Sequence, residues 1–161
     1  MSDPSNLDSR RERRPPWYAA GVRFSCQEDC GACCTDHGEY VYVYLEWGDA
    51  ERLAAHLGLS RSDFLSRFTT FEDRDRILIM NGPDCPFLEG TRCSVYPARP
   101  VQCRTFPFWE DNLASRARWR RLREFCPGID TGGLHDLEAI QRHLDERREA
   151  ECCAFAPERS D

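Results

Sequence analysis

The stretch FSCQEDCGACC, residues 24–34, places four cysteines within nine positions, and two of them are adjacent. Cys26 and Cys30 are separated by three residues, and Cys30 and Cys33 by two. These spacings bring side chains together on one face of a helix or within one turn, as a chelated ion requires. Adjacent side chains point apart in both helices and strands, so we expect Cys33 and Cys34 to serve two different sites that lie close together.

Four more cysteines follow at wide spacing. Three of them lie in GPDCPFLEGTRCSVYPARPVQCRTFPF, residues 82–108, a long stretch with little periodicity that is unusual unless a ligand or a function orders it. Zinc takes four thiolate or imidazole ligands, and iron–sulfur clusters are commonly held by four thiolates. Eight cysteines therefore predict two four-cysteine sites, or one such site with four cysteines in other roles. The predicted metal ligands are Cys26, Cys30, Cys33, Cys34, Cys85, Cys93, Cys103 and Cys126.

We expect zinc as the metal, with two ions if the cysteines form two sites. An iron–sulfur cluster is the alternative. Bringing residue 26 to residue 126 closes a long loop, so we expect metal binding and folding to be coupled. The competing interpretation of any single cysteine is a small buried hydrophobic residue. Eight cysteines in a Pro- and Gly-rich setting are hard to explain in that way.

The composition narrows the class of protein. The 161 residues carry 28 acidic and 22 basic side chains, for a net charge of -6, which argues against a general nucleic-acid binder. Every basic residue is arginine, so the lysines of a P-loop or of a Schiff base are excluded. A chain of this length is also too short for the barrel of about 250 residues that radical enzymes with Cys-x3-Cys-x2-Cys clusters usually need.

The expected location follows from two further observations. No stretch approaches the roughly 20 apolar residues of a membrane span, and the first residues lack the apolar region of a secretory signal. We therefore expect a cytoplasmic protein without a membrane partner. Cytosolic cysteines are usually kept reduced, which favours metal ligands over disulfides, although an oxidised cysteine scaffold is the alternative.

The periodicity predicts a small single α+β domain, with short strands and a few helices organised around the cysteine sites. We expect a disordered tail over 1–16, a cysteine-cluster domain over 17–130, and a helix and tail over 131–161 packed on it. The expected elements are strands within 39–47 and 76–82, helices within 47–59 and 60–68, a ribbon within 105–125 and a helix within 133–151. The buried stripe of that last helix is predicted to be Leu134, Leu137, Ile140 and Leu144.

The segments CQEDCGACC, CPFLEGTRCSVYPARPVQCRTFPF and CPGI resemble the YkgJ-type cysteine cluster proteins, a family of zinc- or iron-chelating domains. The resemblance spans residues 24 to about 130 and includes all eight cysteines. It implies a small metal-binding domain, which is also found as part of flagellin lysine methylases, and it implies no particular reaction. Cys152 and Cys153 lie outside the pattern, and nothing is carried over to them.

Several side chains near the cysteines are candidates for supporting roles. We expect Arg99 and Arg104 to donate hydrogen bonds to thiolate sulfurs, since four thiolates around zinc carry a formal charge of about -2. An ordinary surface ion pair and an anionic substrate site are the alternatives. The aromatic residues expected to pack over the sites are Tyr96, Phe106, Phe108 and Trp109.

Other polar residues carry weaker signals. RARWRRLRE, residues 116–124, holds five arginines, and we expect a solvated face more than a surface for RNA, DNA or an acidic partner. His37 follows Cys34 closely enough to replace a cysteine at one site. The remaining candidates are His56, His135 and His143, expected at the surface or at caps, and Asp36, Asp84 and Glu89, which flank cysteines.

We predict that the protein is an accessory or adaptor factor with structural metal sites. Such a role is compatible with a protein partner. The alternative is a metal-dependent modification enzyme or component, for example for methyl transfer, or a metal or redox carrier with an iron–sulfur cluster. Enzymatic activity stays open, since no Ser/His/Asp set, paired carboxylates or nucleotide glycine motif is recognisable.

Overall fold

The computed structural model describes residues 14–27, 29–35 and 42–154, except for the side chains of residues 153 and 154. Most of the tail predicted over 1–16 therefore lies outside the described residues. Asp36, His37 and the first part of the strand predicted within 39–47 lie outside them as well. The fold is α+β: short helices and small two-stranded antiparallel sheets surround two hydrophobic clusters.

The first hydrophobic cluster is built on helices α1 (Asp49–Leu57) and α2 (Arg61–Phe68). Leu53 and Phe64 are fully buried in it. Helix α1 ends at Gly58, which has φ +67°, and Ser60 caps α2 by accepting the Asp63 N–H at 3.0 Å. Glycine after a helix and serine before one are the expected stop and start signals, and both predicted helices are confirmed.

Strands β2 (Thr69–Glu72) and β3 (Asp75–Leu78) form a hairpin beside these helices. The strand predicted within 76–82 therefore starts one residue earlier and ends at Leu78. In the described part of 39–47, only Tyr44 makes a strand bridge, to Ile77. The alternating aromatic and aliphatic residues thus form a short extended segment beside β3, joined to it by one bridge.

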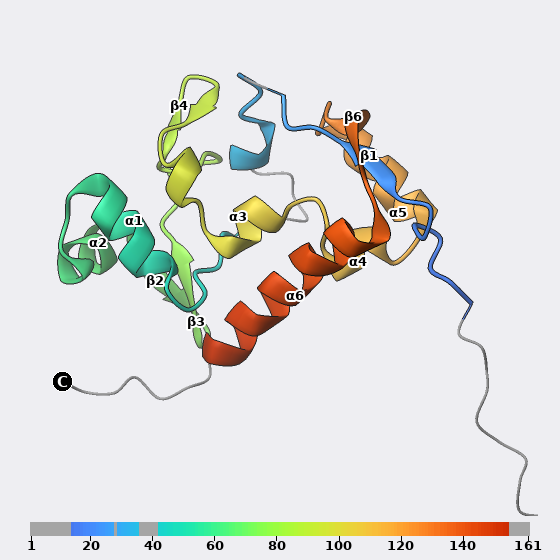
Figure 1. Ribbon diagram of the computed structural model, residues 1–161. Helices are drawn as coiled ribbons and strands as arrows, with labels where there is room; N and C mark the ends of the chain where they lie inside the picture. Colours follow the sequence, from blue (N-terminus) through green and yellow to red (C-terminus); the bar gives the residue numbers. More distant parts are fainter. Residues whose placement is uncertain (1–13, 28, 36–41, 155–161) are drawn as a thin grey trace, which may run out of the picture.

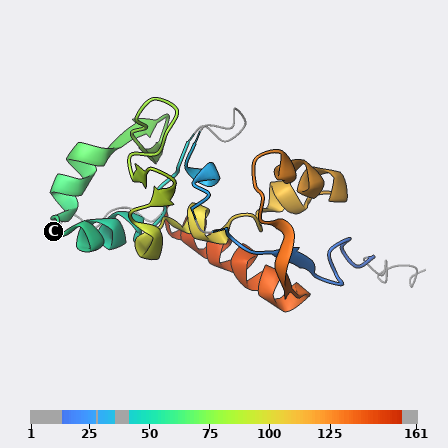
Figure 2. The ribbon, with the colours of Figure 1, turned by 90° about the horizontal axis from the view of Figure 1, so that it is seen from above.

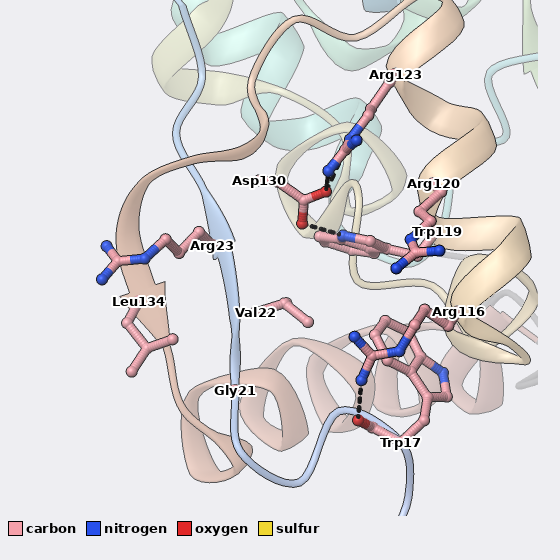
Figure 3. Close-up of a pocket in the computed structure, with 10 residues that line it drawn as sticks. All are labelled: Trp17, Gly21, Val22, Arg23, Arg116, Trp119, Arg120, Arg123, Asp130 and Leu134. Carbon is pink, nitrogen blue, oxygen red and sulfur yellow. Dashed lines mark hydrogen bonds and ion pairs between the residues drawn. The ribbon is translucent and has the colours of Figure 1, made fainter.

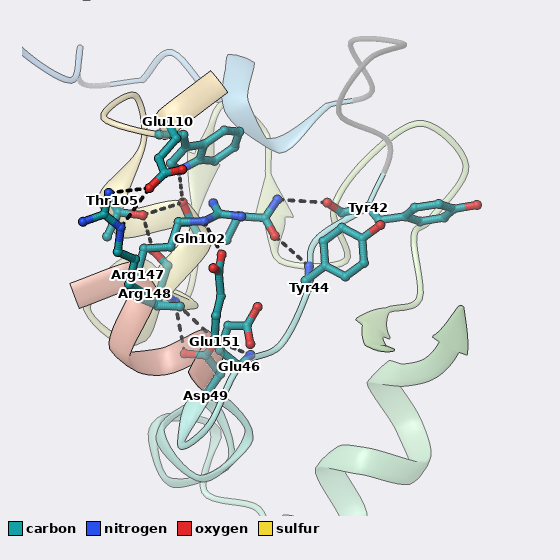
Figure 4. Close-up of polar contacts among 12 residues, drawn as sticks. Tyr42, Tyr44, Glu46, Asp49, Gln102, Thr105, Glu110, Arg147, Arg148 and Glu151 are labelled. Carbon is teal, nitrogen blue, oxygen red and sulfur yellow. Dashed lines mark hydrogen bonds and ion pairs between the residues drawn. The ribbon is translucent and has the colours of Figure 1, made fainter. Parts of the chain in front are cut away.

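The outer edge of this extended segment is closed by one side chain instead of another strand. The Gln102 amide donates to the Tyr42 carbonyl at 3.0 Å, and its carbonyl oxygen accepts the Tyr44 N–H at 2.8 Å (Figure 4). A side-chain amide can satisfy both backbone groups in this way, which removes the need for a full sheet ladder. Gln102 belongs to helix α3 (Val101–Thr105) and is itself buried.

Helix α3 is tied to α1 through a buried carboxylate. Asp49 is fully buried, and its oxygens accept the backbone N–H groups of Val101 at 3.1 Å and Glu46 at 2.9 Å. Burial raises the pKa of Asp49, and these hydrogen bonds together with the Arg52 guanidinium act in the opposite direction. The carboxylate therefore joins the start of α1 to the start of α3.

The second hydrophobic cluster lies on the other side of α3. Its strands β1 (Val22–Phe24) and β6 (Ile129–His135) pair antiparallel, with Val22 opposite His135. The region 105–125 is helical, so the predicted ribbon is wrong. The helices there are α4 (Glu110–Leu113), α5 (Arg116–Arg121) and the 3-10 helix η3 (Leu122–Glu124). The polar stretch EDNLAS begins one helix and caps the next, because Ser115 accepts the Arg118 N–H at 3.2 Å.

Helix α6 (Leu137–Ala154) closes the second cluster with Ile140 and Leu144. Leu134 is 58% exposed and lies in β6, so its place in the predicted buried stripe is wrong. Leu137 is 40% exposed at the first turn, which also departs from the prediction. The reason is that pairing of β6 with β1 holds the chain extended through His135, so the helix starts later than the hydrophobic pattern indicates.

The two clusters are arranged around α3 and α6. In Figure 1 and Figure 2, α1 and α2 lie on one side of the molecule and β1, β6, α4 and α5 on the other. Helix α6 runs between the two sides, and the short 3-10 helix η1 (Ala32–Cys34) lies in the middle in both views. The remaining short elements are β4 (Leu88–Glu89), β5 (Arg92–Cys93) and the 3-10 helix η2 (Tyr96–Ala98). No helix in the described ranges has the length and apolar character to cross a membrane.

Candidate metal centre

The predicted metal ligands come from both sides of the molecule. Cys34, Cys85 and Cys93 pack against the first hydrophobic cluster, and Cys126 packs against the second. Cys103 lies on α3 between them. All nine cysteines whose side chains the structure describes are free thiols. The cysteine segments therefore meet where the two clusters meet.

Cys34 is at the centre of the best-defined thiol group. Its side chain is a hydrogen-bond partner of the Cys33, Cys85 and Cys93 thiols. The backbone supports this contact, because the Cys85 N–H donates to the Cys34 carbonyl at 2.7 Å and Thr35 forms a strand bridge with Asp84. Cys85 and Cys93, which are distant from Cys34 in sequence, are thus brought to its sulfur.

A glycine shapes the turn that presents these thiols. Gly31 has φ +59°, and a Cβ there would lie 2.9 Å from the Thr91 carbonyl oxygen. The Cys34 N–H donates to the Gly31 carbonyl at 2.9 Å and closes η1. Glycine allows the left-handed backbone and the close approach to the β4–β5 hairpin, which carries Cys93.

The hydrogen bonds within this group shift the pKa values of its thiols in two directions. The hydrogen bond with Cys34 lowers the pKa of Cys33 to about 7 and that of Cys93 to about 6. It also lowers the pKa of Cys85. The same contacts with Cys33, Cys85 and Cys93, together with burial, raise the pKa of Cys34. The thiolate is the metal-binding form of cysteine, and three of these four thiols are shifted toward it.

Cys103 lies beside this group. Burial raises the pKa of its thiol, and the neighbouring charges on Cys33, Cys85 and Cys93 act in the same direction. Cys33 and Cys103 both line a cavity of about 40 Å³, together with Phe106, Trp109 and other side chains. A bound cation would reverse the effect of this environment on a thiol, because coordination removes the proton.

Cys126 has a different set of neighbours. Burial raises the pKa of its thiol, and a hydrogen bond from the Gly128 backbone opposes this effect. The nearby Cys30, Cys33 and Cys26 act in the same direction as burial. The Ser25 N–H donates to the Gly128 carbonyl at 3.2 Å, which holds the chain after β1 against the chain after η3. A Cβ at position 128 would lie 2.3 Å from the Ser25 carbonyl oxygen, so the approach requires glycine.

The structure differs from the expected orientation of the Cys33 and Cys34 side chains. Their thiols contact each other, so the prediction that they point apart is wrong. The short 3-10 helix explains the difference, since both residues lie at its C-terminal end, where the chain turns. The two thiols nevertheless differ in their further neighbours: Cys34 contacts Cys85 and Cys93, and Cys33 also acts on Cys126.

The two predicted supporting arginines behave differently. The Arg99 guanidinium lies close enough to Cys33, Cys93 and Cys103 to favour their thiolates. Its Nε is buried without a hydrogen-bond partner among the described residues, and its Cζ lies 3.5 Å from the Tyr96 ring centre. Arg104 instead pairs with Glu146 at 2.5 Å and donates to the Arg99 carbonyl at 3.0 Å.

The aromatic residues predicted to pack over the sites also differ in their positions. Phe106 and Trp109 line the small cavity beside Cys103, and Tyr96 lies under the Arg99 guanidinium. Phe108 is 1% exposed within the second cluster, where it stacks on His143 with ring centres 4.8 Å apart. It therefore supports the second core and does not line the cavity beside the cysteines.

The remaining predicted candidates take minor positions. His56 faces the Ser94 carbonyl at 3.3 Å and lies near Cys93, a proximity that the sequence did not predict. Asp84 bridges Thr35 and Asn81, Glu89 lies in β4, and His135 contacts the Phe24 carbonyl at 3.1 Å. Cys152 is exposed near the end of α6. Within the described ranges, no three His, Cys, Asp or Glu side chains are already arranged around a point that could hold an ion.

The comparisons with known proteins agree with the chemistry of this thiol group. The model of the CxxCxxCC family, described as "Putative zinc- or iron-chelating domain", matches residues 25–127. The match covers more than half of the 161 residues and includes all eight predicted ligands. No solved structure gives a significant match to the chain.

Proposed function

Since this chain belongs to the CxxCxxCC family of zinc- or iron-chelating domains, we propose that it binds two transition-metal ions at adjacent four-cysteine sites. The first site uses Cys34, Cys85, Cys93 and Cys103. The second site uses Cys26, Cys30, Cys33 and Cys126. Zinc is the first choice of metal, and an iron–sulfur cluster is the alternative.

The contact of Cys34 with Cys85 and Cys93 is the observation that carries the proposal. In a tetrahedral site with Zn–S bonds near 2.3 Å, two ligand sulfurs are about 3.8 Å apart, which is close to the distance at which thiols hydrogen-bond. The first site would form by a rearrangement of these sulfurs around the ion, with Cys103 as the fourth ligand. Cys34 gives up its proton, and the sulfurs move from contact with Cys34 to positions around the ion.

The second site is supported by the neighbours of Cys126. Cys26, Cys30 and Cys33 all act on the Cys126 thiol, and no sulfur needs to be shared with the first site. The contact between Cys33 and Cys34 would then place the two ions side by side. This division keeps the adjacent cysteines in different sites, as the sequence predicts.

The charge of the proposed sites fits their surroundings. Four thiolates around a divalent ion carry a formal charge of about -2, and a guanidinium group is well suited to balance it. Arg99 acts on Cys33, which belongs to the second site, and on Cys93 and Cys103, which belong to the first. Its buried Nε, which has no partner in the described part of the chain, offers a donor for a sulfur.

The proposed role of the ions is structural. The first site draws on residues packed against the first hydrophobic cluster, and the second draws on Cys126 from the second cluster. Metal binding would join the two halves across η1, as structural zinc does in domains with a small core. The function proposed is therefore that of an accessory or adaptor factor whose fold depends on its metal.

A cobalt titration tests this proposal. Reduced, metal-free full-length protein is titrated with Co²⁺ without oxygen, and the visible spectrum is followed, because tetrahedral thiolate coordination gives intense absorption. We expect saturation at two ions per chain and displacement of the cobalt by zinc. Weak, octahedral-type absorption that never saturates would overturn the four-cysteine assignment.

A further inference from the structure

The segment that carries Cys26 is attached to a part of the chain that lies about 100 residues further on in the sequence. The Ser25 N–H donates to the Gly128 carbonyl at 3.2 Å. The Gln27 amide donates to the Thr131 hydroxyl at 3.3 Å. Cys26 lies between these two contacts and is therefore held against this later part of the chain.

The part of the chain that receives these contacts has a constrained backbone. Asp130 lies between Gly128 and Thr131 in the sequence and has φ +61°, which is uncommon for a residue other than glycine. Its carboxylate accepts the Trp119 indole N–H at 2.9 Å and the Arg123 Nε–H at 2.8 Å (Figure 3). Trp119 is 1% exposed. This end of the segment is thus tied to the core of the second hydrophobic cluster.

The other end of the segment is attached to the β4–β5 hairpin by an ion pair. The Arg92 Nε and Nη2 groups both donate to the Asp29 carboxylate, the second of them at 3.0 Å. Two hydrogen bonds of this kind fix the orientation of the two side chains as well as their distance. Asp29 directly precedes Cys30, and Arg92 directly precedes Cys93. The ion pair therefore joins the neighbour of a second-site ligand to the neighbour of a first-site ligand.

The backbone brings the segment and the hairpin together at the same place. Asp29 has φ +60°, a conformation that few residues other than glycine adopt. Two residues later, a Cβ at Gly31 would lie 2.9 Å from the Thr91 carbonyl oxygen and 3.0 Å from the Leu88 Cδ1. The hairpin thus meets the segment at Asp29 and at Gly31, and Cys30 lies between the two contacts.

We propose that Asp29 and Arg92 are positioning residues for the second metal site, which place Cys30 where it shares an ion with Cys126. This inference rests on the proposed division into two sites. Cys26 is held from one end of the segment and Cys30 from the other, so the ion pair sets the separation of the two sulfurs. The side chains of Asp29 and Arg92 are 51% and 71% exposed, and exposed ion pairs add little to the free energy of unfolding. Loss of the pair should therefore change metal affinity more than stability.

The zinc affinities of the full-length protein, measured by competition with a chelator, test this role. Asp29→Asn removes the charge and keeps the backbone, because asparagine adopts the left-handed conformation more readily than most residues. We expect one of the two ions to bind at least about tenfold more weakly, the usual effect of losing a group that supports a metal ligand. The other ion should keep its affinity within about twofold, because Cys93 is also held by its pairing with Leu88 in the hairpin.

Further variants show whether the ion pair itself is responsible. Arg92→Gln should weaken the same ion, and the double variant should be no weaker than either single one, since both residues act through one contact. In the Cys126→Ser background, which lacks the proposed second site, Asp29→Asn should leave the remaining ion unaffected. Salt at about 1 M should reduce the difference between the unaltered protein and Asp29→Asn, because it screens exposed charges.

Glu138→Gln is the matched control. Glu138 forms an exposed ion pair with Arg142 at 2.8 Å on α6, outside the cysteine segments, so its loss should change neither zinc affinity by more than about twofold. Hydrogen exchange of the purified proteins gives a readout that does not depend on the number of ions. Peptides within 26–34 should exchange faster in Asp29→Asn and Arg92→Gln than in the unaltered protein, and Glu138→Gln should leave them unchanged.

Three outcomes would overturn the proposal. The first is that Asp29→Asn behaves like Glu138→Gln in both zinc affinity and hydrogen exchange. The second is equal weakening of both ions, which would assign the ion pair to the general stability of the fold. The third is complete loss of one ion from Asp29→Asn, which would make Asp29 a ligand. An unaltered protein that takes up fewer than two zinc ions would instead contradict the proposed function, and the exchange measurement still tests the ion pair in that case.

Discussion

The backbone N–H of Cys85 donates to the carbonyl oxygen of Cys34 at 2.7 Å, and the thiols of the same two residues are also in contact. The N-terminal cysteine cluster is thereby anchored to the loop that carries the next predicted ligand. This contact between backbone groups supports the relationship independently of the two thiols. The metal would then complete an arrangement that the backbone has already begun.

The proposed division into two sites predicts selective losses of metal. Cys93→Ser should remove the ion of the first site, and Cys126→Ser should remove the ion of the second. Each variant should lose about one metal ion per chain, because three thiolates remain where four are needed. Elemental analysis of the purified variants measures the loss.

Cys152→Ser is the matched control for these two variants. Cys152 is exposed on α6, outside both proposed sites, so its replacement should leave the metal content unchanged. Loss of metal from this control would show that the set of ligands is wrong. Loss of all metal from both Cys93→Ser and Cys126→Ser would indicate one shared centre in place of two sites.

The different environments of Arg99 and Arg104 predict different effects on metal affinity. Arg99→Gln should weaken zinc binding by about 10–100-fold, the usual effect of removing a group that supports metal ligands. Arg104→Gln removes an ion pair with Glu146 and should leave the zinc affinity nearly unchanged. Competition with a chelator of known affinity measures both. Equal effects of the two substitutions would contradict the role given to Arg99.

Gly128 predicts a steric test of the contact between the two cysteine segments. An alanine Cβ there would lie 2.3 Å from the Ser25 carbonyl oxygen, so Gly128→Ala should destabilise the fold by about 1–3 kcal/mol. At Gly133 nothing lies within 4 Å of an added Cβ, so Gly133→Ala provides a nearby control. Denaturant unfolding compares the two. A stability loss in the control as large as that of Gly128→Ala would rule out the steric explanation.

His143 predicts part of the pH dependence of stability. Burial against Phe108 lowers the pKa of His143 below its ordinary value of 6.5, and nearby His135 and Arg142 act in the same direction, while Glu146 opposes them. As the pH falls through 6.5, the unfolded chain takes up a proton that the folded chain does not. Stability is therefore full above this pH and decreases below it.

His143→Phe keeps a ring against Phe108 and removes the titrating group. Between pH 7.5 and 5.5, the free energy of unfolding of this variant should fall less steeply than that of the unaltered protein. Urea unfolding at a series of pH values measures both slopes. Identical slopes would show that His143 remains as free to take a proton in the fold as in the unfolded chain.

Local signals in the sequence were sufficient for the helices of the first cluster. Glycine is typical after the end of a helix and serine before the start of one. In the structure Gly58 ends α1 and Ser60 caps α2. Gln102 shows the opposite case. Nothing around it in the sequence indicates that its amide replaces a strand beside Tyr42 and Tyr44, because that pairing depends on residues about 60 positions apart.

The second cluster shows why the rest could not be predicted. Leu134 fits the helical stripe of α6, but pairing of β6 with β1, more than 100 residues away in sequence, keeps it in a strand. The solvated face predicted for the arginines within 116–124 is confirmed, since all five are exposed. Side chains gathered from distant segments define the thiol group, and spacing alone does not reveal such contacts.

Metal analysis with an absorption spectrum, on protein isolated without oxygen, tests the central claim most directly. The account predicts about two zinc ions per chain and a colourless protein, or iron with absorption near 400 nm if the cysteines hold a cluster. Removal of the metal with a strong chelator should unfold the chain, since binding and folding are coupled. A metal-free protein that stays folded, with its cysteines joined as disulfides, would contradict the account.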